Sequence, residues 1–169
     1  CGRKGGDLVF GMEAKLSTLD QHVNAANATR NVAMNIFETL MTRDENMAPV
    51  LDLADSLDIS QDGKTYTFKL RPGVKFHNGK PLTSADVAGS FARYKRIGID
   101  RSALDAIDRW ETPDDATFRI ILKEPRATFL ESISASTVPI VIVPADQSNA
   151  EPTQLKPIGT GPFELVEFV

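Results

Sequence analysis

The chain has 169 residues, of which 41% are hydrophobic and 25% are charged. A chain of this size buries roughly 68–70% of its unfolded surface, and the composition is that of a globular protein rather than a disordered one. Its densest apolar run, residues 138–143, has the length of a strand, whereas a membrane-spanning helix needs about 20 apolar residues. The sequence therefore predicts a globular chain with a core.

The charge balance argues against a nucleic-acid-binding protein, and the scarcity of histidine and cysteine argues against a zinc site. The chain has 19 Lys and Arg against 23 Asp and Glu, a net charge of −4, so we expect no basic nucleic-acid-binding face. Two histidines and one cysteine are too few for a zinc site built from Cys and His. Only a metal site with oxygen ligands stays open, and no motif calls for a cofactor.

The single cysteine is Cys1, and it precedes a glycine-rich, basic stretch, residues 2–6. One interpretation is a cloning remnant or an incidental thiol at a frayed terminus. The other is the lipid-carrying first residue of a mature bacterial lipoprotein, with the stretch as a tether. Both interpretations stay open on the sequence.

The first half of the chain predicts a strand, a helix and a hairpin. Residues 7–11 are expected as a strand, and Asn24 as the cap of a helix over residues 25–40 with an apolar residue at every fourth position. Period-two alternation over residues 57–70, interrupted by Asp62 and Gly63, predicts a β-hairpin.

The second half adds one well-marked helix and three strands. Thr83 and Asp86 have the spacing of a capping box, which predicts a helix from Ser84 to about Lys95. Strands are expected over residues 116–123, 138–143 and 163–169, and a short helix over residues 127–133. Because helices and strands are interspersed, the fold class is α/β (mixed α+β) with a mixed sheet.

No set of residues predicts catalysis or phosphate binding. His22, near a helix start, and His77, beside a turn, are best explained as polar or backbone-bonded residues. The acid pairs Asp105 with Asp108 and Asp114 with Asp115 have the spacing of ordinary surface acids. The Gly-Thr-Gly turn at residues 159–161 lacks the lysine of a phosphate-binding loop.

Several segments nevertheless carry a resemblance to a known family, in the family's order. They are residues 19–22 (LDQH), 35–40 (NIFETL), 49–54, 60–87 (SQDGKTYTFKLRPGVKFHNGKPLTSADV), 122–125, 129–130 and 159–163 (GTGPF). The chain resembles the extracellular solute-binding proteins of ABC importers, family 5, which take up oligopeptides, dipeptides and nickel. One departure is Gln21, where the family usually has proline.

The resemblance implies a periplasmic-binding-protein-like fold of class II with two lobes. Residues 1–44 would begin the first lobe, residues 45–136 would form the extra subdomain of this class, and residues 137–169 would return into the first lobe. Family members are several times longer, so the chain would be an N-terminal fragment that does not include the second lobe.

The resemblance also implies which residues face the ligand. Glu13 and Ala14 follow the first expected strand, and Ser136 and Thr137 approach the buried strand. Extended backbone there could pair with a peptide, and Glu13 could offer a negative charge to an amine. An equally acceptable interpretation is that Glu13 only solvates a loop.

The implied function is that of a non-enzymatic receptor. It would capture a peptide-like or related small ligand and deliver it to an ABC permease, as a monomer when full length, in the periplasm or another extracytoplasmic space, with or without a lipid anchor. Two alternatives stay open: an enzyme whose catalytic part lies outside this chain or uses the acid pairs, and a free-standing docking domain.

Overall fold

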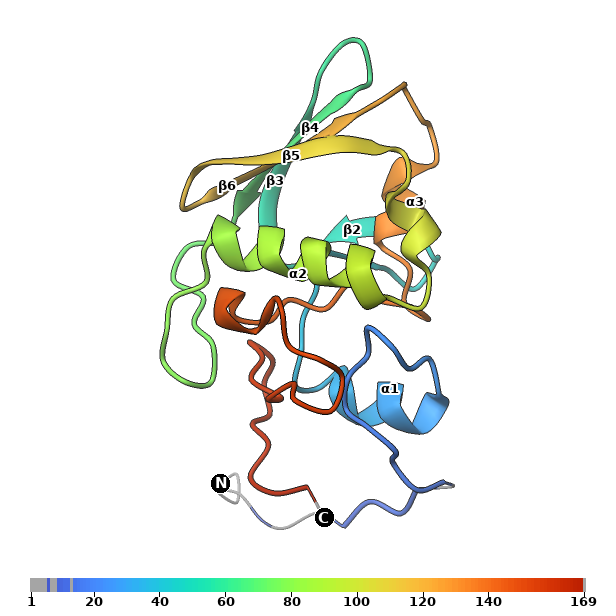
Figure 1. Cartoon of the computed structure of the whole chain (residues 1–169), viewed down its shortest axis with the longest axis vertical. Helices are drawn as coiled ribbons and strands as arrows, with labels where there is room; N and C mark the ends of the chain where they lie inside the picture. Colours follow the sequence, from blue (N-terminus) through green and yellow to red (C-terminus); the bar gives the residue numbers. More distant parts are fainter. Residues whose placement is uncertain (1–5, 7–8, 13, 169) are drawn as a thin grey trace, which may run out of the picture.

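The computed structural model of the chain describes residues 6, 9–12 and 14–168. Its elements, in chain order, are α1 (Asn27–Ala33), β1 (Met41–Arg43), β2 (Pro49–Leu51), β3 (Ala54–Ile59), β4 (Thr65–Leu70), α2 (Ser84–Ile97), a 3-10 turn (Arg101–Leu104), β5 (Ile107–Asp114), β6 (Thr117–Leu122), α3 (Phe129–Ile133) and a second 3-10 turn (Ala145–Gln147). The long helix α2 lies against the larger sheet, and α1 lies toward the opposite end of the molecule (Figure 1).

The larger sheet has the order β3-β4-β6-β5, and all its pairs are antiparallel. Alternate residues of β4 and β6 are buried on one face: Tyr66, Phe68, Leu70, Phe118, Ile120 and Leu122. Helix α2 covers this face, and its Phe91 ring lies 5.1 Å from the Phe118 ring, centroid to centroid. The period-two pattern thus correctly predicted the hairpin, strand β6 and their buried face.

The hairpin turn and the cap of α2 lie where the sequence predicts them. Asn24 is not the cap of α1, however, because the N-cap is Ala26 and makes no side-chain cap hydrogen bond. Gly63 and Gly79 have φ of +66° and +81°, a region that glycine enters without steric cost. At the start of α2 the Thr83 backbone N–H donates to Asp86 Oδ2 at 2.8 Å, within a complete capping box. These local signals depend only on neighbouring residues, which is why sequence spacing reveals them.

The expected helix over residues 25–40 is much shorter, and this prediction is corrected. Helix α1 ends at Ala33, because its continuation is prevented by competing hydrogen bonds. The Thr39 N–H donates to Asp52 Oδ2 at 3.0 Å rather than to a helix carbonyl. The Gly161 N–H donates to the Ile36 carbonyl at 2.9 Å. Tertiary contacts therefore outweigh the helical periodicity.

Three strand predictions are also wrong within the described residues. Residues 140–143 are buried, but they make only an isolated bridge between Val141 and Thr39. Residues 9–11 and 163–168 form no strand, and no parallel pair makes the sheet mixed. Strand β5 was not expected, because it is mostly exposed and lacks clear alternation. Residues 140–143 thus have the apolar composition of a buried strand without the ladder of hydrogen bonds that defines one.

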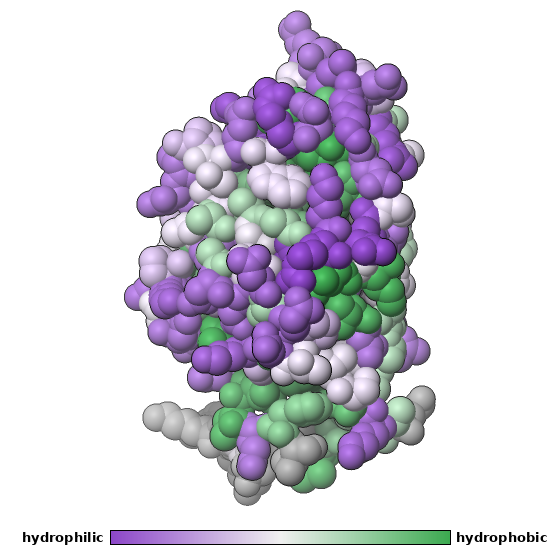
Figure 2. Space-filling view, viewed as in Figure 1, coloured by the Kyte–Doolittle hydropathy of each residue, from purple (hydrophilic) through white to green (hydrophobic). Residues whose placement is uncertain are grey.

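The end of the molecule that carries α1 and residues 163–168 is rich in exposed apolar side chains. Its exposed side chains are Val9, Phe10, Met12, Met34, Phe163, Val166 and Phe168. Figure 2 shows apolar atoms gathered at this end, below a largely polar surface. We call these seven residues the terminal apolar surface.

Within the residues that the structure describes, no helix is both long and apolar enough to pass through a membrane.

Candidate ligand-binding site

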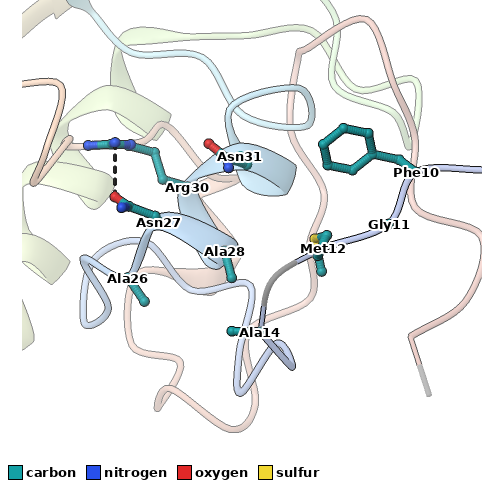
Figure 3. A pocket seen from close by; sticks show the side chains of 9 residues that line it. All are labelled: Phe10, Gly11, Met12, Ala14, Ala26, Asn27, Ala28, Arg30 and Asn31. Atoms are coloured by element: carbon teal, nitrogen blue, oxygen red, sulfur yellow. Dashed lines mark hydrogen bonds between the residues drawn. The ribbon is translucent and has the colours of Figure 1, made fainter.

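Two pockets flank helix α1. The first, about 490 Å³, lies between α1 and the segment that contains Phe10, Met12 and Ala14, as Figure 3 shows. The second, about 360 Å³, is lined by residues that include Met34, Glu38, Thr39, Asp52 and Ser136. Both volumes fall in or near the range typical of small-molecule sites.

Arg30 is the residue that the two pockets share. It lies in the last turn of α1, and its Nη2 donates to Asn27 Oδ1 at 3.0 Å. In Figure 3 its guanidinium extends away from Phe10 and Met12. The cation thus lies to the side of the first pocket, where it also reaches the second.

A hydrogen-bonded pair fixes the wall of the second pocket. Asp52 Oδ2 accepts from the Thr39 N–H at 3.0 Å and lies 3.2 Å from Thr39 Oγ1. Thr39 also forms the bridge to Val141. The wall near Ser136 is therefore built by three segments that are distant in sequence.

The four expected ligand-facing residues are distributed unevenly. Ala14 is exposed beside the first pocket and Ser136 beside the second. Thr137 is exposed but lines neither pocket. Glu13, like Cys1, lies outside the described residues. The two segments do not meet in one pocket, and Arg30, which the sequence did not single out, connects them.

The sequence also missed a buried polar cluster of Asp20, His22 and Arg93. Their side chains are almost completely inaccessible to solvent. Arg93 Nη1 and Nη2 donate to the two Asp20 oxygens at 3.0 and 2.6 Å, and Arg93 Nε donates to the Ala150 carbonyl at 3.0 Å. This bidentate pair joins α2 to the segment before α1, because each partner's charge is satisfied only by the other.

His22 completes the cluster: it is a polar, backbone-bonded residue shortly before α1, as expected, but its complete burial was not foreseen. Its Nδ1 accepts from Arg93 Nη1 at 2.9 Å, so its Nε2–H donates to the Val141 carbonyl at 2.9 Å. Burial, and then the positive charge of Arg93, lower the pKa of His22 to about 4, against opposing effects of Asp20 and the Val141 hydrogen bond. The imidazole is therefore neutral at pH 7.

One sequence signal for this cluster existed. Asp86, Ser90 and Arg93 recur at helical spacing on the face of α2 that is buried, and polar residues on a buried helix face need partners. Ser90 also bonds to the segment after α3, since the Val143 N–H donates to its Oγ at 3.0 Å. The partners could not be found from the sequence, because they lie more than 50 residues away.

His77 is backbone-bonded, one of the two roles expected for it. The Gly159 N–H donates to its Nδ1 at 3.3 Å, and its Nε2 lies 2.8 Å from the Gly161 carbonyl. The Gly-Thr-Gly turn is thus held between His77 and the residues after α1. A Cβ at Gly159 would lie 2.0 Å from the Ile36 carbonyl oxygen, so the glycine permits a close backbone approach.

The acid pairs are exposed residues of turns and strand ends. Asp108 pairs with Arg109 at 2.9 Å, and Asp114 accepts from Thr117 Oγ1 at 2.8 Å. The Thr117 hydrogen bond is the main cause that lowers the pKa of Asp114. Across residues 6, 9–12 and 14–168 no three His, Cys, Asp or Glu residues are grouped to hold a metal ion.

Comparison with known proteins gives the family. Residues 48–169 match the model of the bacterial extracellular solute-binding proteins, family 5, middle region. The chain belongs to this family. The glutathione-binding protein GsiB of Pectobacterium atrosepticum is 30% identical over 96% of the chain, which spans 32% of that relative.

Solved structures of this family share the fold. AppA, the oligopeptide-binding protein of Bacillus subtilis, solved with a nonapeptide, is 27% identical with a TM-score of 0.84, covering 99% of this chain and 35% of AppA. AgaA of A. tumefaciens R10, solved with agropinic acid, is 32% identical with a TM-score of 0.81, covering 92% of this chain and 32% of AgaA. The mixed α/β fold is that of substrate-binding proteins, and the chain spans about a third of the length of these relatives.

Proposed function

We propose that this chain forms part of the ligand-binding cleft of a receptor for an ABC importer. The receptor captures a peptide-like or related small ligand and hands it to a membrane permease, without covalent chemistry. Family membership over residues 48–169 is the observation that carries this proposal. It favours a receptor over an enzyme that uses Asp105 and Asp108, and over a free-standing docking domain.

The proposed division of the chain is the one that the family resemblance implies. Residues 1–44 and 137–169 belong to the first lobe, residues 45–136 form the extra subdomain, and a second lobe closes on the ligand from the other side. The four-stranded sheet and α2 lie within residues 45–136, which supports a separate subdomain. The buried Arg93–Asp20 pair supports a subdomain fixed rigidly to the lobe.

The proposed ligand face is the surface around both pockets, from Glu13 and Ala14 past Arg30 to Ser136 and Thr137. Two observations support it: the pockets lie side by side along α1 and share Arg30, and most of the polar side chains that line the second are at least partly exposed. Since one lobe contributes only half of such a cleft, pockets this open are what an unclosed face would present.

We further propose an extracytoplasmic location, because a relative in Sinorhizobium fredii is named a probable peptide ABC transporter periplasmic-binding protein. The full-length protein is proposed to be a monomer. Lipidation of Cys1 is a part of this proposal that mass spectrometry of the protein from its native membrane tests. A mass increase from acyl chains on the first residue is expected, and an unmodified cysteine contradicts it.

The test of the function is binding without turnover. Full-length protein is titrated with a panel of di- and tripeptides while its melting temperature and the chemical integrity of each peptide are followed. A receptor gives saturable stabilisation and returns every peptide intact. Peptide cleavage that is lost in an Asp105→Asn or Asp108→Asn variant would instead identify an enzyme.

A further inference from the structure

A buried glutamine lines the second pocket. Of the described residues around this pocket, only Gln21, Phe37 and Val141 are buried, with 2%, 3% and 1% of their surface exposed. The other lining residues, which include the charged Arg30 and Asp52, are partly or fully exposed. We call the three buried residues the base of the pocket. The base thus combines one carboxamide with two apolar side chains, and the charges lie nearer to solvent.

The turn that contains Gln21 is held on both sides. Its neighbours Asp20 and His22 both bond to Arg93 inside the buried cluster, and the His22 N–H donates to Asp20 Oδ1 at 3.1 Å. The Val23 N–H donates to the Asp20 carbonyl at 3.3 Å. The base of the pocket is therefore preorganised, and little freedom of Gln21 remains to be lost when a ligand binds.

The carboxamide of Gln21 has no hydrogen-bond partner in the part of the chain that the structure describes. Polar groups of the same pocket use other partners, since Arg30 Nη2 donates to Asn27 Oδ1 and the Thr39 N–H donates to Asp52. The amide atoms of Gln21 are not among the completely enclosed side-chain atoms without a partner. Both atoms therefore stay open to the pocket.

A buried polar group normally has a hydrogen-bond partner, so the free carboxamide of Gln21 points to a ligand. The fold itself does not need this amide, because the family usually has proline at the position. A glutamine amide offers one acceptor oxygen and two N–H donors. A carboxylate only accepts and an ammonium group only donates, so each would satisfy one side of the amide and leave the other unpaired.

A residue of an extended peptide satisfies both sides at once. Its N–H and its carbonyl point in the same direction, as they do between paired antiparallel strands. A sugar also carries groups that donate and accept, but its many hydroxyls would lie against Phe37 and Val141, whose side chains form no hydrogen bonds. The base of the pocket thus matches the backbone of a peptide better than a sugar.

We propose that Gln21 is a specificity-determining residue, whose carboxamide pairs with the uncharged backbone of one extended residue of the ligand. The N–H of that residue donates to Gln21 Oε1, and its carbonyl accepts from Nε2–H. Phe37 and Val141 contact the apolar atoms next to this pair. The inference rests on the proposed receptor function and adds the chemical group that the base of the second pocket recognises.

The experiment compares trialanine with two ester analogues on the full-length protein. In the first analogue an ester oxygen replaces the N–H of the second residue, and in the other it replaces the N–H of the third. Only the second residue of trialanine has both its N–H and its carbonyl in peptide bonds. Calorimetry should therefore show about 10–100-fold weaker binding of the first analogue, the cost of leaving a buried acceptor unpaired, and a smaller loss for the second.

Gln21→Leu tests the assignment, because it removes both hydrogen-bonding atoms and keeps a side chain of similar size. The preference for trialanine over the first analogue should fall to about twofold or less. The melting temperature without ligand should not fall, since the chain loses no hydrogen bond.

Gln147→Leu is the matched control. Gln147 is also buried, but it lies outside the second pocket, and its Oε1 accepts from the Lys156 N–H at 2.6 Å. This variant should lower the melting temperature and leave the preference for trialanine unchanged.

Each other outcome decides between the two levels of the account. Equal binding of trialanine and both analogues, or an unchanged preference in Gln21→Leu, shows that the amide inference is wrong and leaves the receptor function in place. Binding of the sugar maltose without binding of trialanine has the same meaning, and so does failure of the wild-type protein to bind trialanine at all. Cleavage of trialanine without saturable binding overturns the receptor function itself.

Discussion

Arg93 places a full charge where the side chain has no contact with solvent. Its partner Asp20 lies outside residues 45–136, the proposed subdomain that contains α2, so the pair links two segments that are 73 residues apart in the sequence. Burying two charges is costly, and their attraction offsets this cost only while both partners are present. The pair should therefore be sensitive to loss of one partner rather than strongly stabilising in itself.

Replacement of Arg93 by methionine should lower the free energy of unfolding by about 3–5 kcal/mol, because Asp20 would remain charged and buried. Urea denaturation of the full-length protein measures this change. Arg96→Met is the matched control, since Arg96 pairs with Glu151 at 2.6 Å on the exposed side of the same helix and should change stability by less than about 1 kcal/mol. Equal losses in the two variants would contradict the account.

His22 should make stability depend on pH between 6.5 and 4. Its pKa falls from 6.5 in the unfolded chain to about 4 in the fold, so the unfolded chain binds more protons in this window. The stabilisation is complete above pH 6.5 and is lost as the pH falls toward 4, by roughly 3 kcal/mol at the full extent. Denaturation at several pH values measures it.

The control for this pH dependence is His22→Gln, which keeps a hydrogen-bonding side chain but does not titrate. The difference in stability between wild type and variant should narrow progressively from pH 7 to pH 4, because carboxylates contribute equally to both. A constant difference across that range would mean that His22 is not buried as a neutral imidazole.

At the scale of elements, the Gly-Thr-Gly turn explains why α1 is short. The turn is held by His77 and accepts no side chain at Gly159, where a Cβ would lie 2.0 Å from the Ile36 carbonyl oxygen. This close approach lets the Gly161 N–H use that carbonyl at 2.9 Å. The turn thus packs against the residues that end the helix and begin the wall of the second pocket.

Gly159→Ala should lower the free energy of unfolding of the full-length protein by about 1–3 kcal/mol. The added Cβ would collide with backbone atoms, which cannot move aside as a flexible side chain could. The ligand affinity of this variant should also fall, since residues 36–39 lead into the second pocket. Gly6→Ala is the control, because a Cβ there meets nothing within 4 Å and the residue lines neither pocket. An unchanged melting temperature for Gly159→Ala would refute this close packing.

Prediction from sequence succeeded where a structure depends on neighbouring residues. The sequence predicted the β3–β4 hairpin, the capped helix α2 and strand β6. Alternation of apolar and polar residues and helix capping both depend on residues only a few positions apart. The prediction of a helix over residues 25–40 failed because residues distant in sequence form hydrogen bonds with its backbone groups. Asp52, for example, accepts from the Thr39 N–H. The same reason hid the Arg93 cluster and the role of Arg30, whose significance depends on which segments fold beside α1.

For the whole molecule, the terminal apolar surface is informative. Phe10 is 71% exposed, Phe163 64% and Val166 97%, and large apolar side chains exposed together mark a surface that is normally covered. The chain spans only 32% of a relative's length. We therefore expect this surface to be covered by polypeptide corresponding to the part of the relatives that the chain does not span.

The 169-residue chain alone should accordingly bind the dye ANS and self-associate, whereas the full-length protein should do neither. Light scattering and dye fluorescence at matched concentration compare the two. Phe163→Ser in the short chain should reduce both signals, because it removes apolar area from this surface. A monomeric short chain without dye binding would show that the surface needs no cover.

The most direct test of the ligand face is hydrogen exchange of the full-length protein with and without saturating trialanine. We predict that bound trialanine slows hydrogen exchange in residues 30–39 and 136–142, on both sides of the second pocket. Exchange in the distant β3–β4 turn, residues 60–64, should not change. Protection confined to that turn and the outer sheet, with residues 30–39 and 136–142 unchanged, would contradict the central claim that this face binds the ligand.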